Sequence, residues 1–236
     1  MKKIKIFTII LPVIFLAFNA SSQTTDMQTK ADDSKAKSDE DAVKRSGEWV
    51  SALNLNDVDK EARVKEVVAT HLKAIRDWNN GHPFTTVPAG INPATGNKLS
   101  DLDRQVIAIS AMPKSVHENL MTGLRKDLTE EQVELILDKY TVGKVAFTLN
   151  GYKSIVPNLT QTEEAEILKN LKQAREQAVD YKNMKQISAI FEIYKTKCEQ
   201  YLNANGRNWR QMYKDYTDKI KAKKASEQQT KKTDQE

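Results

Sequence analysis

The sequence predicts a mainly all-α protein with a single helical-bundle-like domain of about six to seven helices. Apolar residues recur every three or four positions over most of the chain, which is the spacing of one buried helix face. Two capping-box signatures, Thr129 with Gln132 and Thr160 with Glu163, each mark the start of a helix. The alternation expected of strands is confined to residues 142–156.

The first 22 residues have the pattern of a cleaved signal peptide. Three lysines precede an apolar run, and small residues precede a cleavage site near Ser22–Gln23. The run is shorter than the roughly 20 residues that cross a bilayer core. The single cysteine, Cys198, lies far from that site, so we do not expect a lipoprotein. We expect a periplasmic or secreted protein that is not inserted in a membrane after cleavage.

The segments on either side of the domain are polar. Residues 23–45 are rich in charged and small polar side chains and contain no aromatic residue, so we expect a disordered linker. Residues 217–236 have a similar composition and predict a charged tail, either mobile or a frayed helix. Residues 46–216 remain as the helical domain, which is long enough to bury one core.

Helix starts and stops within the domain follow from local chemistry. Asp57 and Ser100 are suited to cap helices, and Pro113 suits a first helical turn. The two capping boxes begin two more helices. A further helix runs from about Met184 to Asn203 and stops near Gly206, and a short amphipathic segment follows from Trp209.

Residues 142–156 leave two structures open. Val145, Phe147 and Leu149 alternate before Asn150-Gly151, which is a hairpin signal. An isolated hairpin is marginal in water, however, and the neighbouring segments are helical. The sequence therefore permits either a short β-hairpin or a kinked helix here.

The charge distribution argues against a nucleic-acid partner. The chain carries a net charge of +5. The signal segment contributes +3, the linker −1 and the tail +2, which leaves +1 for residues 46–216. A nearly neutral, exported domain lacks the basic surface typical of nucleic-acid binders.

The sequence predicts no catalytic residue, metal site or cofactor. The three histidines, His71, His82 and His117, lack partners at zinc-ligand spacing, and glycine-rich phosphate loops and nucleophile elbows are missing. His71 lies on an apolar helix stripe and is expected to be a core histidine. Cys198 also lies on such a stripe and is expected to be a packed thiol.

The candidate ligand-binding residues begin with the long loop after the first predicted domain helix. Residues 79–98 contain three prolines and three glycines and no apolar period, and loops of this length are often functional. The start of the loop combines aromatic rings with amides and an imidazole, which are groups that a sugar requires. The candidates are Trp78, Asn79, Asn80, His82 and Phe84. The alternative is that the aromatic residues attach the loop to the bundle.

A second candidate set adds Tyr152 and Arg175. They belong to a group of tyrosines and basic residues near residues 140–182. The alternative is that the basic residues form a solvated helix face, and that the tyrosine rings cover the core while their hydroxyl groups contact solvent.

Four stretches resemble a known secreted family. They are Glu48 to Leu55, Leu128 to Val133, Gly151 to Thr160 and Ala174 to Ala178. The family is number 3826 among domains of unknown function, is common in gut-type Bacteroidetes and is described as sugar-binding. The similarity spans roughly residues 48–209. The resemblance implies a sugar-binding role and assigns no catalytic residues.

Three functions therefore stand as hypotheses. The first is an exported carbohydrate-binding or glycan-utilisation accessory protein without turnover, whose partner is an oligosaccharide. The second is a periplasmic chaperone or scaffold, because Leu128-Thr129 with Gln132 resembles the Leu-Thr-x-x-Gln motif of helical stress chaperones. The third is a glycan-active enzyme. The ligand and the oligomeric state stay open.

Overall fold

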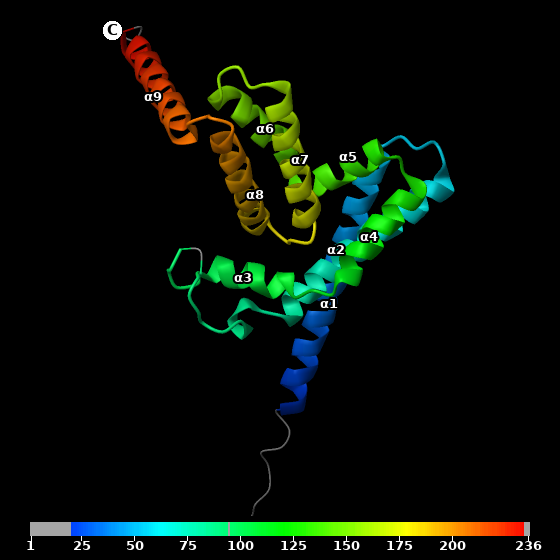
Figure 1. Cartoon of the computed structure of the whole chain (residues 1–236). Helices are drawn as coiled ribbons and strands as arrows, with labels where there is room; N and C mark the ends of the chain where they lie inside the picture. The colour runs from blue at the N-terminus through cyan, green and yellow to red at the C-terminus, as the bar shows by residue number, and fades with distance from the viewer. Residues whose placement is uncertain (1–19, 94, 234–236) are drawn as a thin grey trace, which may run out of the picture. The chain divides into compact units, whose positions relative to one another are not determined.

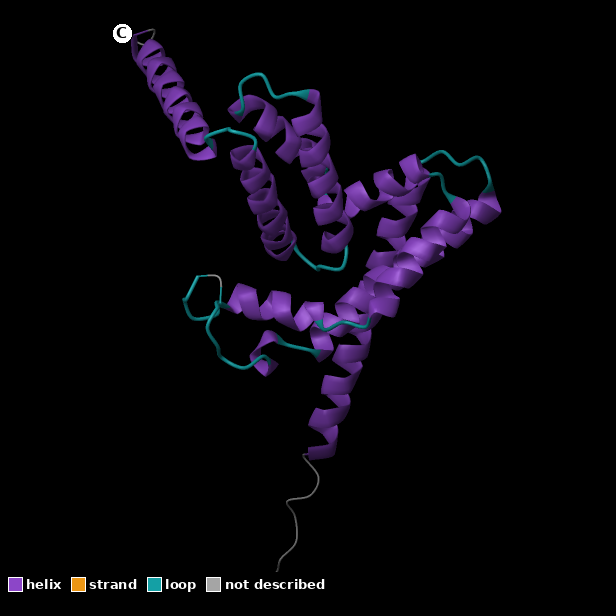
Figure 2. Ribbon diagram, in the orientation of Figure 1, coloured by secondary structure: helices purple, strands orange, loops and turns teal. Residues whose placement is uncertain are grey.

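The computed structural model of the chain describes residues 20–93 and 95–233 (Figure 1). Those residues form nine α-helices and one 3₁₀ helix, without a β-strand (Figure 2). The predicted all-α class is therefore confirmed. The predicted helix number was too low because two helices, α1 and α6, were not counted. The chain divides into two compact units, residues 1–41 and 42–236.

The described part of the first unit is helical. Residues 20–41 belong to helix α1 (Ala20–Ser51), whereas the sequence predicted a disordered linker over residues 23–45. These residues include neither glycine nor proline, and oppositely charged side chains such as Lys35 and Asp39 lie 3.8 Å apart one turn from each other. Such pairs support a helix that is polar on all faces. The predicted signal segment lies almost entirely outside the described residues.

The second unit contains two hydrophobic cores. The first core lies between helices α2 (Val58–Gly81), α4 (Lys114–Asp127) and α5 (Glu130–Thr141), and the end of α1 contributes Val50. Its fully buried members are Val50, Val64, Val68, Leu124, Ile136 and Val179. Helices α2 and α4 lie side by side (Figure 1). The expected stripe of α2 is thus the face that packs into this core.

A glycine sets the separation of α2 and α4. A Cβ atom at Gly123 would lie 2.7 Å from Cγ2 of Val67, which is closer than carbon atoms pack. Gly123 therefore permits an approach of the two helices that any larger residue would prevent.

The second core lies between helices α6 (Lys144–Ile155), α7 (Gln161–Ala178) and α8 (Met184–Ala204). Helix α3 (Asp101–Ser110) adds Ile109, and Trp209 of helix α9 (Trp209–Thr233) packs at its edge. Cys198 is fully buried here, as expected, and burial raises the pKa of its thiol to about 11.

The hairpin alternative for residues 142–156 is wrong, because these residues form α6. Val142 and Gly143 adopt left-handed backbone conformations, with φ of 54° and 65°, and separate α5 from α6. Val145, Leu149, Tyr152 and Val156, which face the second core, are spaced by four, three and four residues, as on one face of a helix. Phe147, which suggested strand alternation, is instead 78% exposed.

The predicted helix starts are confirmed. Thr129 and Gln132 form a capping box, as do Thr160 and Glu163, and Asp57 and Ser100 cap α2 and α3. Helix α8 ends before Gly206, whose φ is 82°. Helix α9 continues to Thr233, so the described part of the predicted tail is helical. In the described ranges, every helix is too short or too polar to cross a membrane.

Candidate functional site

The predicted loop residues are held by contacts within the protein. The indole nitrogen of Trp78 donates to the carbonyl of Ala108 at 2.9 Å, and its ring stacks on His82 with centroids 3.5 Å apart. The side-chain amide of Asn79 donates to the carbonyl of Ile75. These contacts occupy one face of the indole and its only polar group. They favour the alternative in which the aromatic residues attach the loop to the bundle.

Residues 84–87 of the loop are held by Arg104 of α3. Its guanidinium lies over the ring of Phe84, 5.4 Å from the centroid, and donates to the carbonyls of Thr85 and Val87. Phe84 begins the 3₁₀ helix η1 (Phe84–Thr86). Asn80 is exposed at the end of α2. The start of the loop is therefore held against α3 by the contacts of Trp78 and of Arg104.

Tyr152 and Arg175 lie in different surroundings. Arg175 is buried and forms ion pairs with Asp138 at 2.8 Å and Glu134 at 3.5 Å, which connect α7 to α5. Tyr152 is also buried, and its hydroxyl donates to the carbonyl of Lys195 at 3.1 Å. Tyr152 nevertheless forms part of the wall of a pocket in the second core's outer surface.

We call this pocket the aromatic pocket. It has a volume of about 630 Å³ and is open to solvent between α6, α8 and α9. Its side chains combine aromatic rings with charged groups, and they include Phe147, Tyr152, Glu192, Lys195, Glu199, Trp209, Tyr213 and Tyr216.

The rings of this pocket form a row. The centroids of Tyr152 and Trp209 are 5.1 Å apart, and those of Trp209 and Tyr213 are 5.9 Å apart. Tyr213 is 51% exposed and Phe147 78% exposed. Trp209, Tyr213 and Tyr216 share one face of α9 because they are spaced by four and three residues. The pocket therefore offers ring surface to solvent from two helices.

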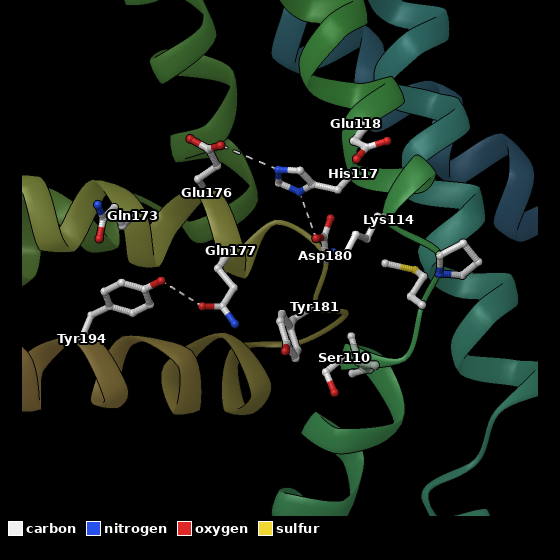
Figure 3. Close-up of a pocket in the computed structure, with 13 residues that line it drawn as sticks. Ser110, Lys114, His117, Glu118, Gln173, Glu176, Gln177, Asp180, Tyr181 and Tyr194 are labelled. Carbon is white, nitrogen blue, oxygen red and sulfur yellow. Dashed lines mark hydrogen bonds and ion pairs between the residues drawn. The ribbon is translucent and has the colours of Figure 1, made fainter.

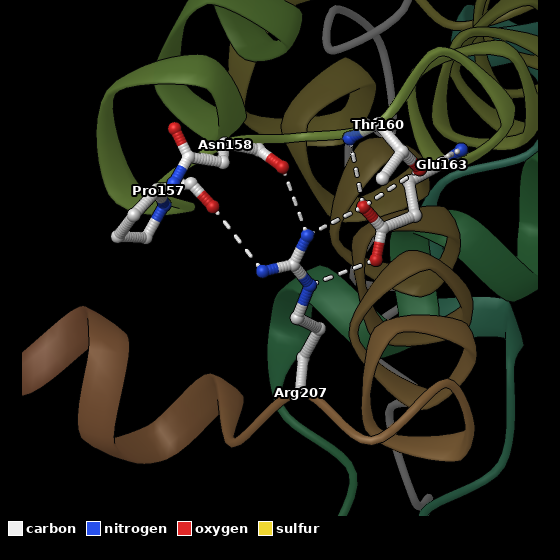
Figure 4. A network of polar contacts seen from close by, with 5 residues as sticks. All are labelled: Pro157, Asn158, Thr160, Glu163 and Arg207. Carbon is white, nitrogen blue, oxygen red and sulfur yellow. Dashed lines mark hydrogen bonds and ion pairs between the residues drawn. The ribbon is translucent and has the colours of Figure 1, made fainter.

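Arg207, two residues before Trp209, makes polar contacts with the connection before α7 and with the first turn of α7 (Figure 4). Its guanidinium donates two hydrogen bonds of 2.8 Å to the carboxylate of Glu163 and also donates to the carbonyls of Pro157 and Asn158. The paired guanidinium lowers the pKa of Glu163 to about 2. Since Arg207 is two residues before Trp209, this clamp holds the first turn of α9 against the start of α7.

Charged groups stand beside the rings. The ammonium of Lys195 pairs with Glu192 at 2.9 Å, and burial raises the pKa of Glu199. The rings and these groups together provide apolar faces and hydrogen-bonding groups on one wall.

A second pocket, which we call the histidine pocket, has a volume of about 730 Å³ (Figure 3). It is formed by the end of α3 and its connection to α4, the first turns of α4, the end of α7, the connection between α7 and α8, and Tyr194 of α8. Its side chains include Ile109, Met112, Lys114, His117, Gln173, Glu176, Gln177, Asp180, Tyr181 and Tyr194.

Asp180 joins two histidines at the wall of this pocket. One carboxylate oxygen contacts Nε2 of His71 at 3.0 Å, and the other contacts Nδ1 of His117 at 2.9 Å. Nδ1 of His71 contacts the hydroxyl of Tyr140 at 3.1 Å. One assignment of protons satisfies every group: both imidazoles donate to Asp180, and Tyr140 donates to His71. His71 is therefore a satisfied core histidine, as expected.

The pKa values reflect this sharing. The hydrogen bond to Asp180 raises the pKa of His117, although burial opposes the charged imidazolium. Burial also disfavours the charged form of Asp180, but the hydrogen bonds from His117 and His71 outweigh it and lower its pKa. Nε2 of His117 lies 3.8 Å from Glu176. His117 is thus a titratable group held between two carboxylates.

Sequence reasoning missed the histidine pocket and found only Tyr152 of the aromatic pocket. His71 and His117 are 46 positions apart, and they meet because α2 and α4 pack side by side. No local signal distinguishes Asp180 from other surface carboxylates. Trp209, Tyr213 and Tyr216 did show helical spacing, but the same spacing describes a buried face. Within the described ranges, His, Cys, Asp and Glu form no group arranged to hold a metal ion.

The fold and the two pockets described above define an all-α bundle protein with surface pockets lined by side chains. The chain belongs to the family described as protein of unknown function (DUF3826), whose model matches residues 39–222. No curated protein matches the chain.

Proposed function

We propose that the chain is an exported carbohydrate-binding accessory protein of glycan utilisation, and that it binds an oligosaccharide in the aromatic pocket. The observation that carries this proposal is the row of rings in an open pocket, with Phe147 and Tyr213 largely exposed beside Glu192 and Lys195. The amino-terminal pattern of a signal peptide supports export.

The chemistry of a sugar matches this wall. The C–H face of a pyranose ring packs on an aromatic face, while its hydroxyls take hydrogen bonds from groups around the ring edge. Pockets for small ligands have volumes of about 300–1,000 Å³, and the aromatic pocket is within this range. Its mixed charges suit a neutral, hydroxyl-rich ligand better than a strongly charged one.

The pocket is also preorganised. The Arg207 clamp and the hydrogen bond from the amide of Trp209 to Asn203 fix the start of α9. A wall that is already ordered loses less conformational entropy when a ligand binds. This support favours binding by the rings without a large rearrangement.

Tryptophan fluorescence tests the proposal, because Trp209 lies in the pocket. The mature protein is titrated with pectic, xylan-type and host-type oligosaccharides. We expect a saturable spectral shift with one class, which Tyr213→Ala and Phe147→Ala weaken at least tenfold. Trp78→Phe should keep the response, whereas loss of the response in Trp78→Phe alone would move the site to the loop. A flat response with every oligosaccharide would contradict the proposal.

The chaperone hypothesis rests on the Leu-Thr-x-x-Gln motif at Leu128-Thr129 and Gln132. The side-chain oxygen of Gln132 accepts from the amide of Thr129, and the hydroxyl of Thr129 accepts from the amide of Gln132. A capping box therefore accounts for these residues, and we retain the chaperone only as the alternative that a flat titration would favour.

A further inference from the structure

His117 and Asp180 have the arrangement of a base and its orienting carboxylate. The Nδ1–H of neutral His117 donates to Asp180, which leaves the lone pair on Nε2. The carboxylate of Glu176, whose side chain is 46% exposed, lies 3.8 Å from this nitrogen. The side chain of His117 is 25% exposed in the pocket wall, whereas that of His71 is 1% exposed. Of these two imidazoles, His117 is the one that a bound molecule reaches.

The remaining network holds Asp180 in place. Its second oxygen accepts from His71, whose other nitrogen accepts from the buried hydroxyl of Tyr140. Asp180 therefore has a fixed orientation, although it lies in the connection between α7 and α8 (Figure 3). If this network only joined helices, it would need the same hydrogen bonds. It would not need a pocket beside His117.

The first turn of α4 adds a feature that suits a developing negative charge. Its N-cap residue, Pro113, makes no side-chain capping hydrogen bond, and both Pro113 and Lys114 line the pocket. Amides at a helix start and a nearby ammonium stabilise an oxyanion. His117 follows one turn later on the same helix.

Besides the charged or titratable side chains of Lys114, His117, Glu118, Glu176 and Asp180, the lining contains apolar and neutral polar groups. Ile109, Met112 and Pro113 supply apolar surface, while Gln173, Gln177 and Tyr194 supply hydrogen-bonding groups. The hydroxyl of Tyr194 donates to Gln177 at 3.1 Å. A small acyl group fits the apolar residues, and a hydroxyl-rich alcohol fits the polar ones.

We propose that the histidine pocket hydrolyses small acyl esters of hydroxyl-rich alcohols, such as O-acetylated sugars, with His117 as the catalytic base. Nε2 of His117 takes a proton from water, and the water oxygen bonds to the acyl carbon. The carbon–oxygen bond to the alcohol then breaks, and the alcohol oxygen receives the proton from His117. The products are a carboxylic acid and a free hydroxyl. Asp180 and His71 are positioning residues.

Acetate release and the hydrolysis of 4-methylumbelliferyl acetate test this proposal on the mature chain. We expect saturable kinetics and acetate release from acetylated xylan. His117→Gln should lower kcat/KM by about 100-fold or more, which is the usual contribution of a general base. Asp215→Asn, a change on the exposed face of α9, should leave kcat/KM unchanged.

The pH profile separates a positioning role from a structural one. Because Asp180, and to a smaller extent Glu176, raise the pKa of His117, kcat/KM should rise with pH through a midpoint above about 6.5, the ordinary histidine value. Asp180→Asn should move this midpoint to lower pH and reduce kcat/KM. A midpoint that Asp180→Asn leaves in place would overturn the role of Asp180. If that variant does not fold, the His117→Gln rate and the wild-type profile still decide the role of His117.

The result is distinct from that of the carbohydrate titration, because the two proposals concern separate pockets. Non-saturable hydrolysis that persists in His117→Gln would overturn the esterase while leaving the fluorescence response of Trp209 intact. Loss of that response in Tyr213→Ala with unchanged ester hydrolysis would support both assignments.

Discussion

The histidine pocket and the aromatic pocket differ in how they satisfy their own side chains. In the first, Asp180, His71, His117 and Tyr140 are hydrogen-bonded to one another. In the second, the rings of Phe147 and Tyr213 remain open to solvent. Hydrogen bonding inside a wall orients groups for chemistry, whereas open ring faces remain available for contact. The difference suggests one pocket suited to proton transfer and another suited to binding.

The two pockets also differ in how far apart their residues lie in the chain. The aromatic pocket is formed by α6, α8 and α9, which all lie within residues 144–233 and border one core. The histidine network joins α2, α4, α5 and the connection after α7. Substitutions in the histidine network should therefore affect the whole fold. Substitutions in the aromatic pocket should affect mainly the local surface.

The largest effect is expected for Asp180→Ala. It leaves the imidazole N–H groups of His71 and His117 without their acceptor in a mostly buried site. We expect the free energy of unfolding to fall by about 3 kcal/mol, the lower end of the cost of breaking a buried pair. Urea unfolding followed by circular dichroism measures it. Asp215→Ala is the exposed control, and a loss below about 1 kcal/mol in Asp180→Ala would contradict a shared network.

Gly123→Ala should have the next largest effect. The added methyl group meets Val67 at 2.7 Å between α2 and α4, and overpacking costs about 1–3 kcal/mol. Gly151→Ala is a matched control in α6, where no atom lies within 4 Å of the added carbon. There the better helix propensity of alanine should stabilise the protein by up to about 1 kcal/mol. Equal thermal shifts in the two variants would show that α2 and α4 can separate without cost.

Tyr152→Phe tests whether the aromatic pocket depends on hydrogen bonds as the other pocket does. The variant loses the bond to the carbonyl of Lys195 and keeps the ring near Trp209. We expect a stability loss of about 1 kcal/mol and an unchanged ligand response. Calorimetry and the fluorescence titration measure the two quantities. A lost response with intact stability would mean that the hydroxyl itself holds the ligand.

The smallest expected effect is an opposite pH dependence in the two regions. The raised pKa of His117 contributes stability that is complete below about pH 6.5 and is lost as pH rises through its folded pKa. The lowered pKa of Glu163, about 2, contributes stability present above its ordinary value and lost as pH falls toward 2. In His117→Gln, urea midpoints should fall less than in the wild type as pH rises above about 6.5. They should become less dependent on acid pH in Glu163→Gln.

Local chemistry made most helix starts predictable. Thr129, Thr160, Ser100 and Asp57 cap helices through residues within three positions, so the signal lies in a short window of sequence. Helix α6 was ambiguous because Phe147, an exposed aromatic residue, imitated strand alternation. Residues 20–41 of helix α1 were unexpected, because a polar helical segment without a buried stripe has the same composition as a mobile segment.

The sites were harder to predict because they depend on tertiary packing. Trp78 has the residue type of a sugar platform, yet its ring stacks on His82. His117 gave no signal because its partner, Asp180, is 63 positions away in a connection between helices. Tyr152 was the one candidate residue that lines the aromatic pocket, although its hydroxyl points into the protein to Lys195.

The Arg207 clamp acts on one end of α9, and this has a consequence for local opening. Residues 209–216 are held by the clamp and the aromatic row, whereas residues 221–227 are exposed on every side. Helix ends with few buried contacts open at little cost in free energy. Backbone amides beyond Ile220 should therefore exchange with solvent deuterium early, while those near Trp209 exchange late. Proteolytic trimming of the far end would shorten the helix and leave the pocket intact.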